Sequence, residues 1–190
     1  MRFNRRLSIT LIIPVLKQVS GSNKGIGFAI VKELCAKFDG DVYLTSRDEN
    51  RGKSAVEEMN KLGLHPKYHQ LDVDDQDSVT KLRDYMKSTY GGLDVLVNNA
   101  AIAFKSTATE SFGEQATVTL RTNFFNTHTA CKILFPILKP HARVVNLSSV
   151  MGHYSMLKGE KKAAAELKNK LASPDLTEEE LSSLMQNFVM

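Results

Sequence analysis

Short apolar runs alternate with longer amphipathic runs along the chain. The short runs are rich in β-branched and aromatic residues, which favours strands, and they lie at 41–45, 67–71, 93–97 and 143–147. The longer runs have apolar residues at helical spacing, and they lie at 28–38, 51–62, 77–90 and 123–138. The runs 93–97 and 143–147 are apolar enough to predict strands that are buried on both faces.

Strands that alternate with helices of this length indicate a parallel sheet with right-handed crossovers. We therefore predict an α/β fold with a doubly wound, Rossmann-like parallel sheet, whose ligands lie at the carboxyl ends of the strands. The last part differs, because residues 160–171 predict a helix and Thr177-x-x-Glu180 is a capping box that begins another, through Phe188. No further strand follows, so we expect a sheet that is incomplete at its C-terminal end, with 143–147 at its edge.

The start of the chain does not match this pattern. A first strand of such a sheet is central and apolar, yet the chain offers Pro14, Lys17 and Gln18 here. We therefore treat 1–190 as one Rossmann-like domain in which residues 1–18 are atypical. Arginines precede the apolar run 7–16, but the run is too short to span a membrane and no small-x-small cleavage site follows. We expect neither secretion nor a membrane segment.

Composition narrows the class of protein further. The net charge of +4 comes from basic residues that are scattered among 21 acidic ones, so it does not indicate a nucleic-acid partner. Cys35 and Cys131 lie in apolar helical stretches and form no disulfide framework, which favours a reducing, cytoplasmic compartment. We expect both to be buried thiols without a chemical role, and we expect no metal site.

Residues 20–27, Ser-Gly-Ser-Asn-Lys-Gly-Ile-Gly, lead directly into the apolar helix 28–38. Glycines let the backbone turn sharply and approach a pyrophosphate, which then lies at the positive end of the following helix. Because this loop opens an alternating α/β pattern, it predicts a dinucleotide site. The predicted contacts are Gly21, Asn23, Lys24, Gly25, Ile26 and Gly27.

Three further motifs follow the glycine loop: Asn-Asn-Ala-Ala at 98–101, Thr-Asn-Phe-Phe at 122–125 and Val-Asn-Leu-Ser-Ser at 145–149. In this order the sequence resembles the short-chain dehydrogenase/reductase family, and the monomeric NADPH-dependent carbonyl reductases in particular. The resemblance runs from about Val19 to Met190. It implies a monomeric oxidoreductase that reduces a small-molecule aldehyde, ketone or quinone to an alcohol.

The charges near the loop indicate which nicotinamide cofactor is used. Enzymes for NAD usually carry an acid after the second strand, where this chain has Arg47, with Lys24 and Arg51 nearby. Guanidinium and ammonium groups favour the 2′-phosphate of NADP(H). The resemblance also implies that Asp72 and Val73 touch the adenine ring and that Asn99 lines the ribose. At 101 the family's usual glycine is alanine, which would crowd the cofactor if the backbone needed a positive φ.

By resemblance, Asn123 organises a proton-relay water and Ser149 binds the carbonyl oxygen. The family's acid is the tyrosine of a Tyr-x-x-x-Lys pair on a later helix. Tyr154 and Lys158 have this spacing, but they follow the strand end too closely, within a segment that glycines make turn-like. Residues 173–190 resemble the start of a helical insertion that precedes the pair in carbonyl reductases.

The expected acid and lysine are therefore absent. This leaves three readings open: a carbonyl reductase, a truncated and catalytically silent NADP(H)-binding isoform, or an unstable fragment. Phe104 and Lys105 border the substrate pocket or occupy an ordinary loop, and the sequence does not decide between the two.

Overall fold

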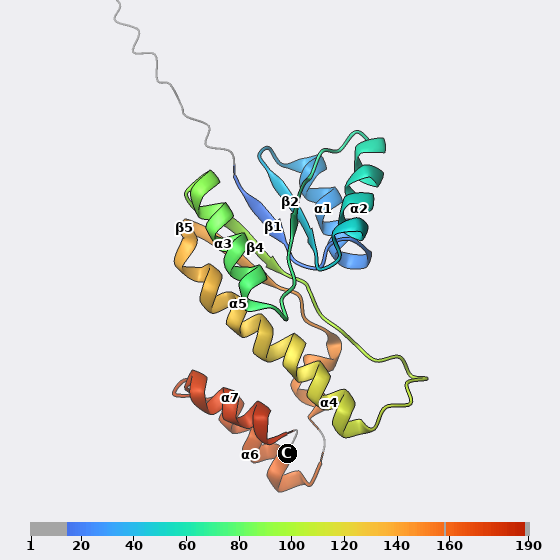
Figure 1. Ribbon diagram of the computed structural model, residues 1–190. Helices are drawn as coiled ribbons and strands as arrows, with labels where there is room; N and C mark the ends of the chain where they lie inside the picture. Colours follow the sequence, from blue (N-terminus) through green and yellow to red (C-terminus); the bar gives the residue numbers. More distant parts are fainter. Residues whose placement is uncertain (1–14, 158, 189–190) are drawn as a thin grey trace, which may run out of the picture.

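A five-stranded parallel sheet organises the computed structural model, which describes residues 15–157 and 159–188 (Figure 1). The strand order is β3-β2-β1-β4-β5. The strands are β1 (Lys17–Val19), β2 (Val42–Ser46), β3 (Lys67–Gln70), β4 (Leu93–Asn98) and β5 (Leu138–Asn146). The chain therefore reverses direction across the sheet between β1 and β4, and the predicted doubly wound fold is confirmed.

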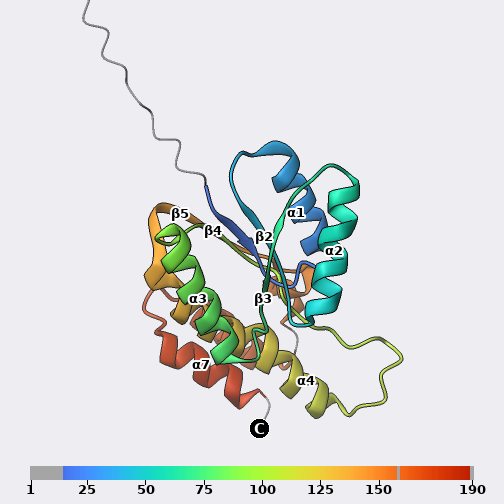
Figure 2. The ribbon, with the colours of Figure 1, turned by 45° about the horizontal axis from the view of Figure 1, so that its top comes forward.

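Helices cover both faces of the sheet (Figures 1 and 2). The helices α1 (Gly25–Lys37) and α2 (Glu49–Lys61) pack on one face, and α3 (Gln76–Tyr90) and α5 (Thr127–Leu134) on the other. The core under α1 and α2 includes Val19, Val31, Leu44, Met59 and Val97. The core under α3 and α5 includes Leu16, Tyr43, Leu82, Met86, Leu96 and Leu134. Each strand of the sheet's centre thus contributes to both cores through alternate side chains.

The helix predicted at 123–138 is wrong at both ends. Helix α4 (Phe112–Leu120) continues through a π-helical turn (Arg121–Asn126) and α5 into a short 3-10 turn (Phe135–Ile137). Ser111 begins α4 through a capping box, in which its Oγ accepts from the Glu114 N–H at 3.3 Å. Leu138 already belongs to β5, which tolerates Pro140 because an edge strand leaves one side unpaired.

Strand β1 is central despite its polar residues. Lys17 is 3% exposed, and its Nζ donates to the carbonyl oxygens of Asp39 at 2.9 Å and Val15 at 3.3 Å. Gln18 Nε2 donates to Thr45 Oγ1 at 3.2 Å, whereas Gln18 Oε1 is buried without a partner. The expectation that Lys17 does not suit a central strand is therefore wrong, because backbone carbonyls solvate its ammonium group. Pro14 and the apolar run from Leu7 lie outside the described residues.

Strand β5 lies at the edge of the sheet, as predicted, but it is not buried. Val145 is 46% exposed, and Val144 and Leu147 are similarly accessible, because β5 pairs with β4 on one side only. The predicted burial of 143–147 is therefore wrong. Two 3-10 turns, Val150–Gly152 and Tyr154–Met156, follow β5 with their apolar side chains exposed.

The predicted C-terminal helices are present as α6 (Lys161–Leu171) and α7 (Glu178–Asn187). The Thr177 capping box is formed, since Thr177 Oγ1 accepts from the Glu180 N–H at 3.1 Å. Glu178 connects α7 to α5 through an ion pair with Lys132, and its Oε1 lies 3.2 Å from His128 Nε2. No helix in the described part of the chain is long and apolar enough to cross a membrane.

Candidate functional site

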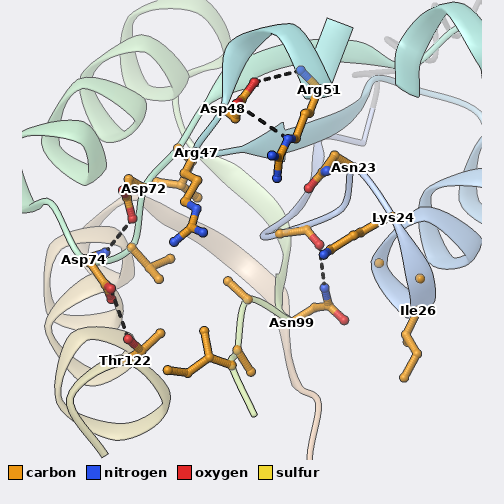
Figure 3. A pocket seen from close by; sticks show the side chains of 18 residues that line it. Asn23, Lys24, Ile26, Arg47, Asp48, Arg51, Asp72, Asp74, Asn99 and Thr122 are labelled. Atoms are coloured by element: carbon orange, nitrogen blue, oxygen red, sulfur yellow. Dashed lines mark hydrogen bonds and ion pairs between the residues drawn. The ribbon is translucent and has the colours of Figure 1, made fainter. Parts of the chain in front are cut away.

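A cavity of about 440 Å³ lies at the carboxyl ends of the strands, where the strand order reverses (Figure 3). Such crevices are where open α/β sheets bind ligands. All of the residues predicted to bind a cofactor line it: Gly21, Asn23, Lys24, Gly25, Ile26, Gly27, Arg47, Arg51, Asp72, Val73 and Asn99. The structure therefore brings together residues from four separate segments of the chain.

Buried hydroxyl groups hold the glycine loop between β2 and β4. Ser20 Oγ accepts from the backbone N–H groups of Asn99 and Ala100, each at 2.9 Å. Ser22 Oγ donates to the Val19 carbonyl oxygen at 2.7 Å and accepts from the Thr45 N–H at 2.9 Å. Sequence reasoning missed both serines as site residues, although they alternate with the loop's glycine in the sequence.

Two glycines of the loop are required by close packing. Gly21 has φ +59°, and a Cβ there would lie 2.9 Å from Ala100 Cα. A Cβ on Gly27 would lie 2.5 Å from Asn99 Nδ2. Asn99 Nδ2 in turn donates to the carbonyl oxygens of Ser20, at 2.8 Å, and Gly21, at 3.1 Å. The loop, the start of α1 and the end of β4 thus form one tightly packed unit.

The N-terminus of α1 has the features of an anion site. Its N-cap, Lys24, makes no side-chain capping bond, and its first turn contains no acidic residue. In contrast, Asp48, Asp75 and Ser111 cap α2, α3 and α4 with side-chain oxygens. The first N–H groups of α1 therefore face the cavity with the positive end of the helix dipole.

Basic side chains add to this positive end. Arg47 and Arg51 extend toward the cavity in Figure 3, and Lys24 lies on its glycine-loop side. Asp48, which is adjacent to Arg47, accepts from the Arg51 N–H at 2.9 Å and lies 3.7 Å from Arg51 Nε. Within the described residues, neither Lys24 nor Arg47 forms an ion pair. Their charges are thus available to a ligand phosphate.

Ala101 does not strain the cavity wall. Among the described non-glycine residues, His141 alone has a positive φ, at 67°. The crowding considered for an alanine at 101 depends on a positive φ, so it does not arise here.

The far wall of the cavity contains residues that sequence reasoning missed. Asp74 follows the predicted pair Asp72 and Val73, and Thr122 precedes Asn123. The Thr122 hydroxyl donates to Asp74 Oδ2 at 3.0 Å (Figure 3). The other lining residues that were not predicted as contacts are Asp48, Leu71, Ala100 and Ile102, whereas Ala101 was expected near the cofactor. Adjacency to a predicted residue was the signal that could have found most of them.

Asn123 lies beside the cavity rather than in its lining, between the lining residues Thr122 and Ile102. It belongs to the π-helical turn, a feature that is frequent at functional sites. Its Oδ1 accepts from the Ile102 N–H at 2.8 Å, and its Nδ2 donates to the Ile102 carbonyl oxygen at 2.8 Å. The side chain therefore fixes the loop after β4 and does not cap a helix.

Ser149 and Tyr154 do not line the cavity. Ser149 is exposed after β5, and its Oγ accepts from the Met151 N–H at 3.2 Å. Tyr154 is 48% exposed in a 3-10 turn, which agrees with the predicted turn-like segment, and Lys158 lies outside the described residues. Phe104 and Lys105 line a separate shallow hollow in the loop 103–110.

The two cysteines are partly buried and unpaired. Burial raises the pKa of both thiols, more than Lys17 lowers that of Cys35 or Asn98 lowers that of Cys131. Both are therefore protonated at neutral pH and are poor nucleophiles. In the described ranges, no three His, Cys, Asp or Glu residues are grouped so that they could hold a metal ion.

Comparison with known proteins gives a consistent result. Residues 18–172 match the family model described as short chain dehydrogenase. Over 171 residues the chain is 53% identical to carbonyl reductase [NADPH] 1 of Bos taurus, which covers 90% of this chain and 60% of the relative. The chain thus spans 60% of the length of this curated relative.

Solved structures extend the likeness to three dimensions. Menthone neomenthol reductase from Mentha piperita superposes with a TM-score of 0.79 at 29% identity, over 93% of this chain and 73% of that one. A short chain dehydrogenase from Burkholderia cenocepacia, solved in complex with NADP, has a TM-score of 0.61 at 26% identity, over 81% and 62% of the two chains.

Proposed function

Because this chain belongs to the short-chain dehydrogenase family, we propose that it forms the NADP(H)-binding part of an enzyme that reduces carbonyl compounds to alcohols. The observation that carries this proposal is the cavity at the uncapped start of α1, with Lys24, Arg47 and Arg51 on its lining. The carbonyl reductase relative supports a small-molecule aldehyde, ketone or quinone as the substrate. We further propose that the protein acts as a cytoplasmic monomer.

The cavity residues fit each part of the cofactor. The first N–H groups of α1 would bind the pyrophosphate, where the tight packing of Gly21 and Gly27 lets the backbone approach closely. Arg47 and Lys24 would bind the 2′-phosphate, which places two cations without an ion-pair partner in the described chain beside a dianion. Asp72 and Val73 would border the adenine ring, and Asn99 the adjoining ribose.

When bound, NADPH would supply the hydride that reduces the carbonyl carbon. The Ser149 hydroxyl would donate a hydrogen bond to the carbonyl oxygen and so polarise the carbonyl group. Asn123 would fix the loop after β4 and organise a water molecule for proton transfer.

The positions of Ser149 and Tyr154, which do not line the cavity, favour a second function, that of a cofactor-binding protein. In that case this chain binds NADP(H) without turnover. The two functions share the cofactor site and differ only in the reaction.

Cofactor titration tests the shared site. We expect NADPH to bind the purified chain more tightly than NADH, and Arg47→Ala to raise the Kd for NADPH about 10–100-fold, as expected for loss of a charged hydrogen bond. The Kd for NADH should change little. Arg83→Ala is the matched control, because Arg83 pairs with Asp84 on the surface of α3.

Turnover then separates the two functions. Oxidation of NADPH with a quinone, abolished by Asn123→Ala or Ser149→Ala, supports the reductase. Binding without turnover supports the second function. Equal affinity for NADPH and NADH in wild type and Arg47→Ala contradicts the assignment of the cofactor site.

A further inference from the structure

Hydrogen bonds of Asp74 connect the segment after β3 with the π-helical turn: its backbone N–H binds Asp72, and its carboxylate binds the turn. The Asp74 N–H donates to Asp72 Oδ1 at 3.0 Å, which forms a turn at the carboxyl end of β3. Asp74 Oδ2 accepts from the Thr122 hydroxyl at 3.0 Å, and Asp74 Oδ1 accepts from Asn126 Nδ2 at 2.9 Å. Both carboxylate oxygens therefore bind the π-helical turn, at residues one turn apart.

The connection continues from the π-helical turn to the loop after β4. Thr122 is followed by Asn123, whose side-chain amide binds both backbone polar groups of Ile102. Ile102 lines the cavity, as do Asp72, Asp74 and Thr122. The segments after β3 and after β4 are thus joined through the turn, although Thr122 and Asp74 are 48 residues apart.

The π-helical turn needs such support. A π turn is rare and occurs mostly as a single turn within an α-helix, so we expect contacts from outside the helix to stabilise it. Thr122 is 5% exposed, and its carbonyl oxygen accepts from the Thr127 hydroxyl at 3.1 Å. The carboxylate of Asp74 is the charged group that binds the turn from the cavity side.

We propose that Asp74 is a positioning residue that holds the π-helical turn, so that Asn123 fixes Ile102 and the wall of the cavity near the reacting carbonyl. The role of that wall rests on the proposed function, whereas the positioning itself does not. Loss of Asp74 then loosens Ile102, which is bonded to Asn123 and not to Asp74 itself. The Asp72–Asp74 segment and the wall held by Asn123 behave as one hydrogen-bonded unit.

Amide hydrogen exchange in the full, ¹⁵N-labelled chain tests the positioning without any ligand. Asp74→Ala should speed exchange of the Ile102 amide about fivefold, because Asn123 no longer holds it constantly. Asp74→Asn should restore slow exchange, since the Asn126 amide can rotate and accept from the new NH₂ group. Thr122→Val removes only the Thr122 hydroxyl that donates to Asp74, so Ile102 should exchange at a rate between those of wild type and Asp74→Ala. This variant replaces Asp74→Ala in the test if Asp74→Ala folds poorly.

Asp75→Ala is the matched control. Asp75 caps α3 by accepting from the Asp77 N–H at 3.0 Å, and in the described part of the chain its side chain makes no hydrogen bond or ion pair with the π-helical turn. This variant should lose stability as Asp74→Ala does but leave Ile102 exchange close to the wild-type rate. Equal exchange of Ile102 in Asp74→Ala and Asp75→Ala would overturn the proposal, because it would mean a general loss of stability.

The Kd for NADPH separates this inference from the proposed function. We expect Asp74→Ala to raise the Kd about fivefold and Asp75→Ala to leave it unchanged. If wild type does not bind NADPH while Ile102 exchange still depends on Asp74, the proposed function fails and the positioning role stands. If wild type binds NADPH and Ile102 exchange does not depend on Asp74, the positioning role fails alone.

Discussion

The loops after β1 and β5 begin at the same edge of one sheet, yet they are held in different ways. The glycine loop after β1 lies between two neighbouring strands, where Ser22 binds Thr45 on one side and Ser20 binds Asn99 on the other. The segment after β5, residues 147–157, has a neighbour on one side, where the Leu147 N–H donates to the Asn98 carbonyl oxygen at 2.9 Å. We refer to these regions as the enclosed loop and the open edge.

The difference teaches that a motif acquires a defined geometry only where strands on both sides fix it. In the enclosed loop, each predicted residue reaches the cavity. At the open edge, Ser149 is exposed and its hydroxyl accepts a single local bond. Three pairs of variants test this difference. Each pair compares a residue of the enclosed loop or the central strand β1 with a residue that is exposed to solvent.

The largest change in stability is expected from a substitution in the enclosed loop. Gly27→Ala should lower the free energy of unfolding by about 3 kcal/mol, because the new Cβ meets packed backbone that cannot easily move. It should also raise the Kd for NADPH at least about tenfold. Gly113→Ala in α4, where nothing lies within 4 Å of a Cβ, should instead gain up to about 1 kcal/mol. Urea unfolding and cofactor titration measure both, and equal effects would remove the distinction.

The second largest difference in stability is expected between variants of Ser22 and Ser149. Ser22→Ala leaves the Thr45 N–H without its partner inside the protein, so we expect a loss of about 2 kcal/mol of unfolding free energy. Ser149→Ala removes one exposed bond and should change stability by less than about 0.5 kcal/mol. Thermal or urea unfolding compares them directly. A large loss in Ser149→Ala would mean that the open edge is held more firmly than its contacts indicate.

The smallest effect concerns two cations in one row of the sheet. Lys17 pairs with Val95, which pairs with Arg143, so the two lie at one level, on a buried and an exposed strand. Burial lowers the pKa of Lys17 below 10.5, its ordinary value, although Asp94 and other acidic groups partly oppose this. We expect Lys17→Met to raise the unfolding free energy at pH 7 by about 1 kcal/mol, and Arg143→Met to leave it unchanged.

The pH dependence of stability tests whether the charge of Lys17 causes this difference. Between the lowered pKa of Lys17 and 10.5, the unfolded chain binds more protons than the folded one, so wild-type stability gains from rising pH. Lys17→Met lacks this gain, and its advantage should shrink as the pH approaches 10.5. An advantage that stays constant with pH would show that packing, not the charge of Lys17, causes it.

The sequence predicted most of the strands and helices because their patterns are local. The glycine loop was likewise predicted because its spacing and the following helix are adjacent in the sequence. The Ser111–Glu114 capping box was also visible there, and overlooking it placed the start of the long helix wrongly. The sequence alone does not reveal that an edge strand can hold Pro140, just beyond the predicted helix.

Other features depend on contacts between distant segments. The bond between Thr122 and Asp74 joins residues that no local pattern relates. The burial of Lys17 follows from where the carbonyl oxygens of Val15 and Asp39 happen to lie. For the same reason the exposure of Val144 and Val145 depends on the absence of a second neighbour for β5 among the described residues, not on their own composition.

The position of β1 also has a consequence during protein synthesis. Leu16, immediately before this strand, donates its backbone N–H to Asp94 Oδ2, and Asp94 is made 78 residues later. At a rate of about 5–20 residues per second, one edge of β1 waits about 4–16 s for its partner β4. Lys17 and Gln18 keep that waiting edge polar, and charged residues on unpaired edges discourage pairing with other nascent chains. Polar residues that the finished sheet accommodates through bonds to Val15, Asp39 and Thr45 thus also protect the unfinished sheet.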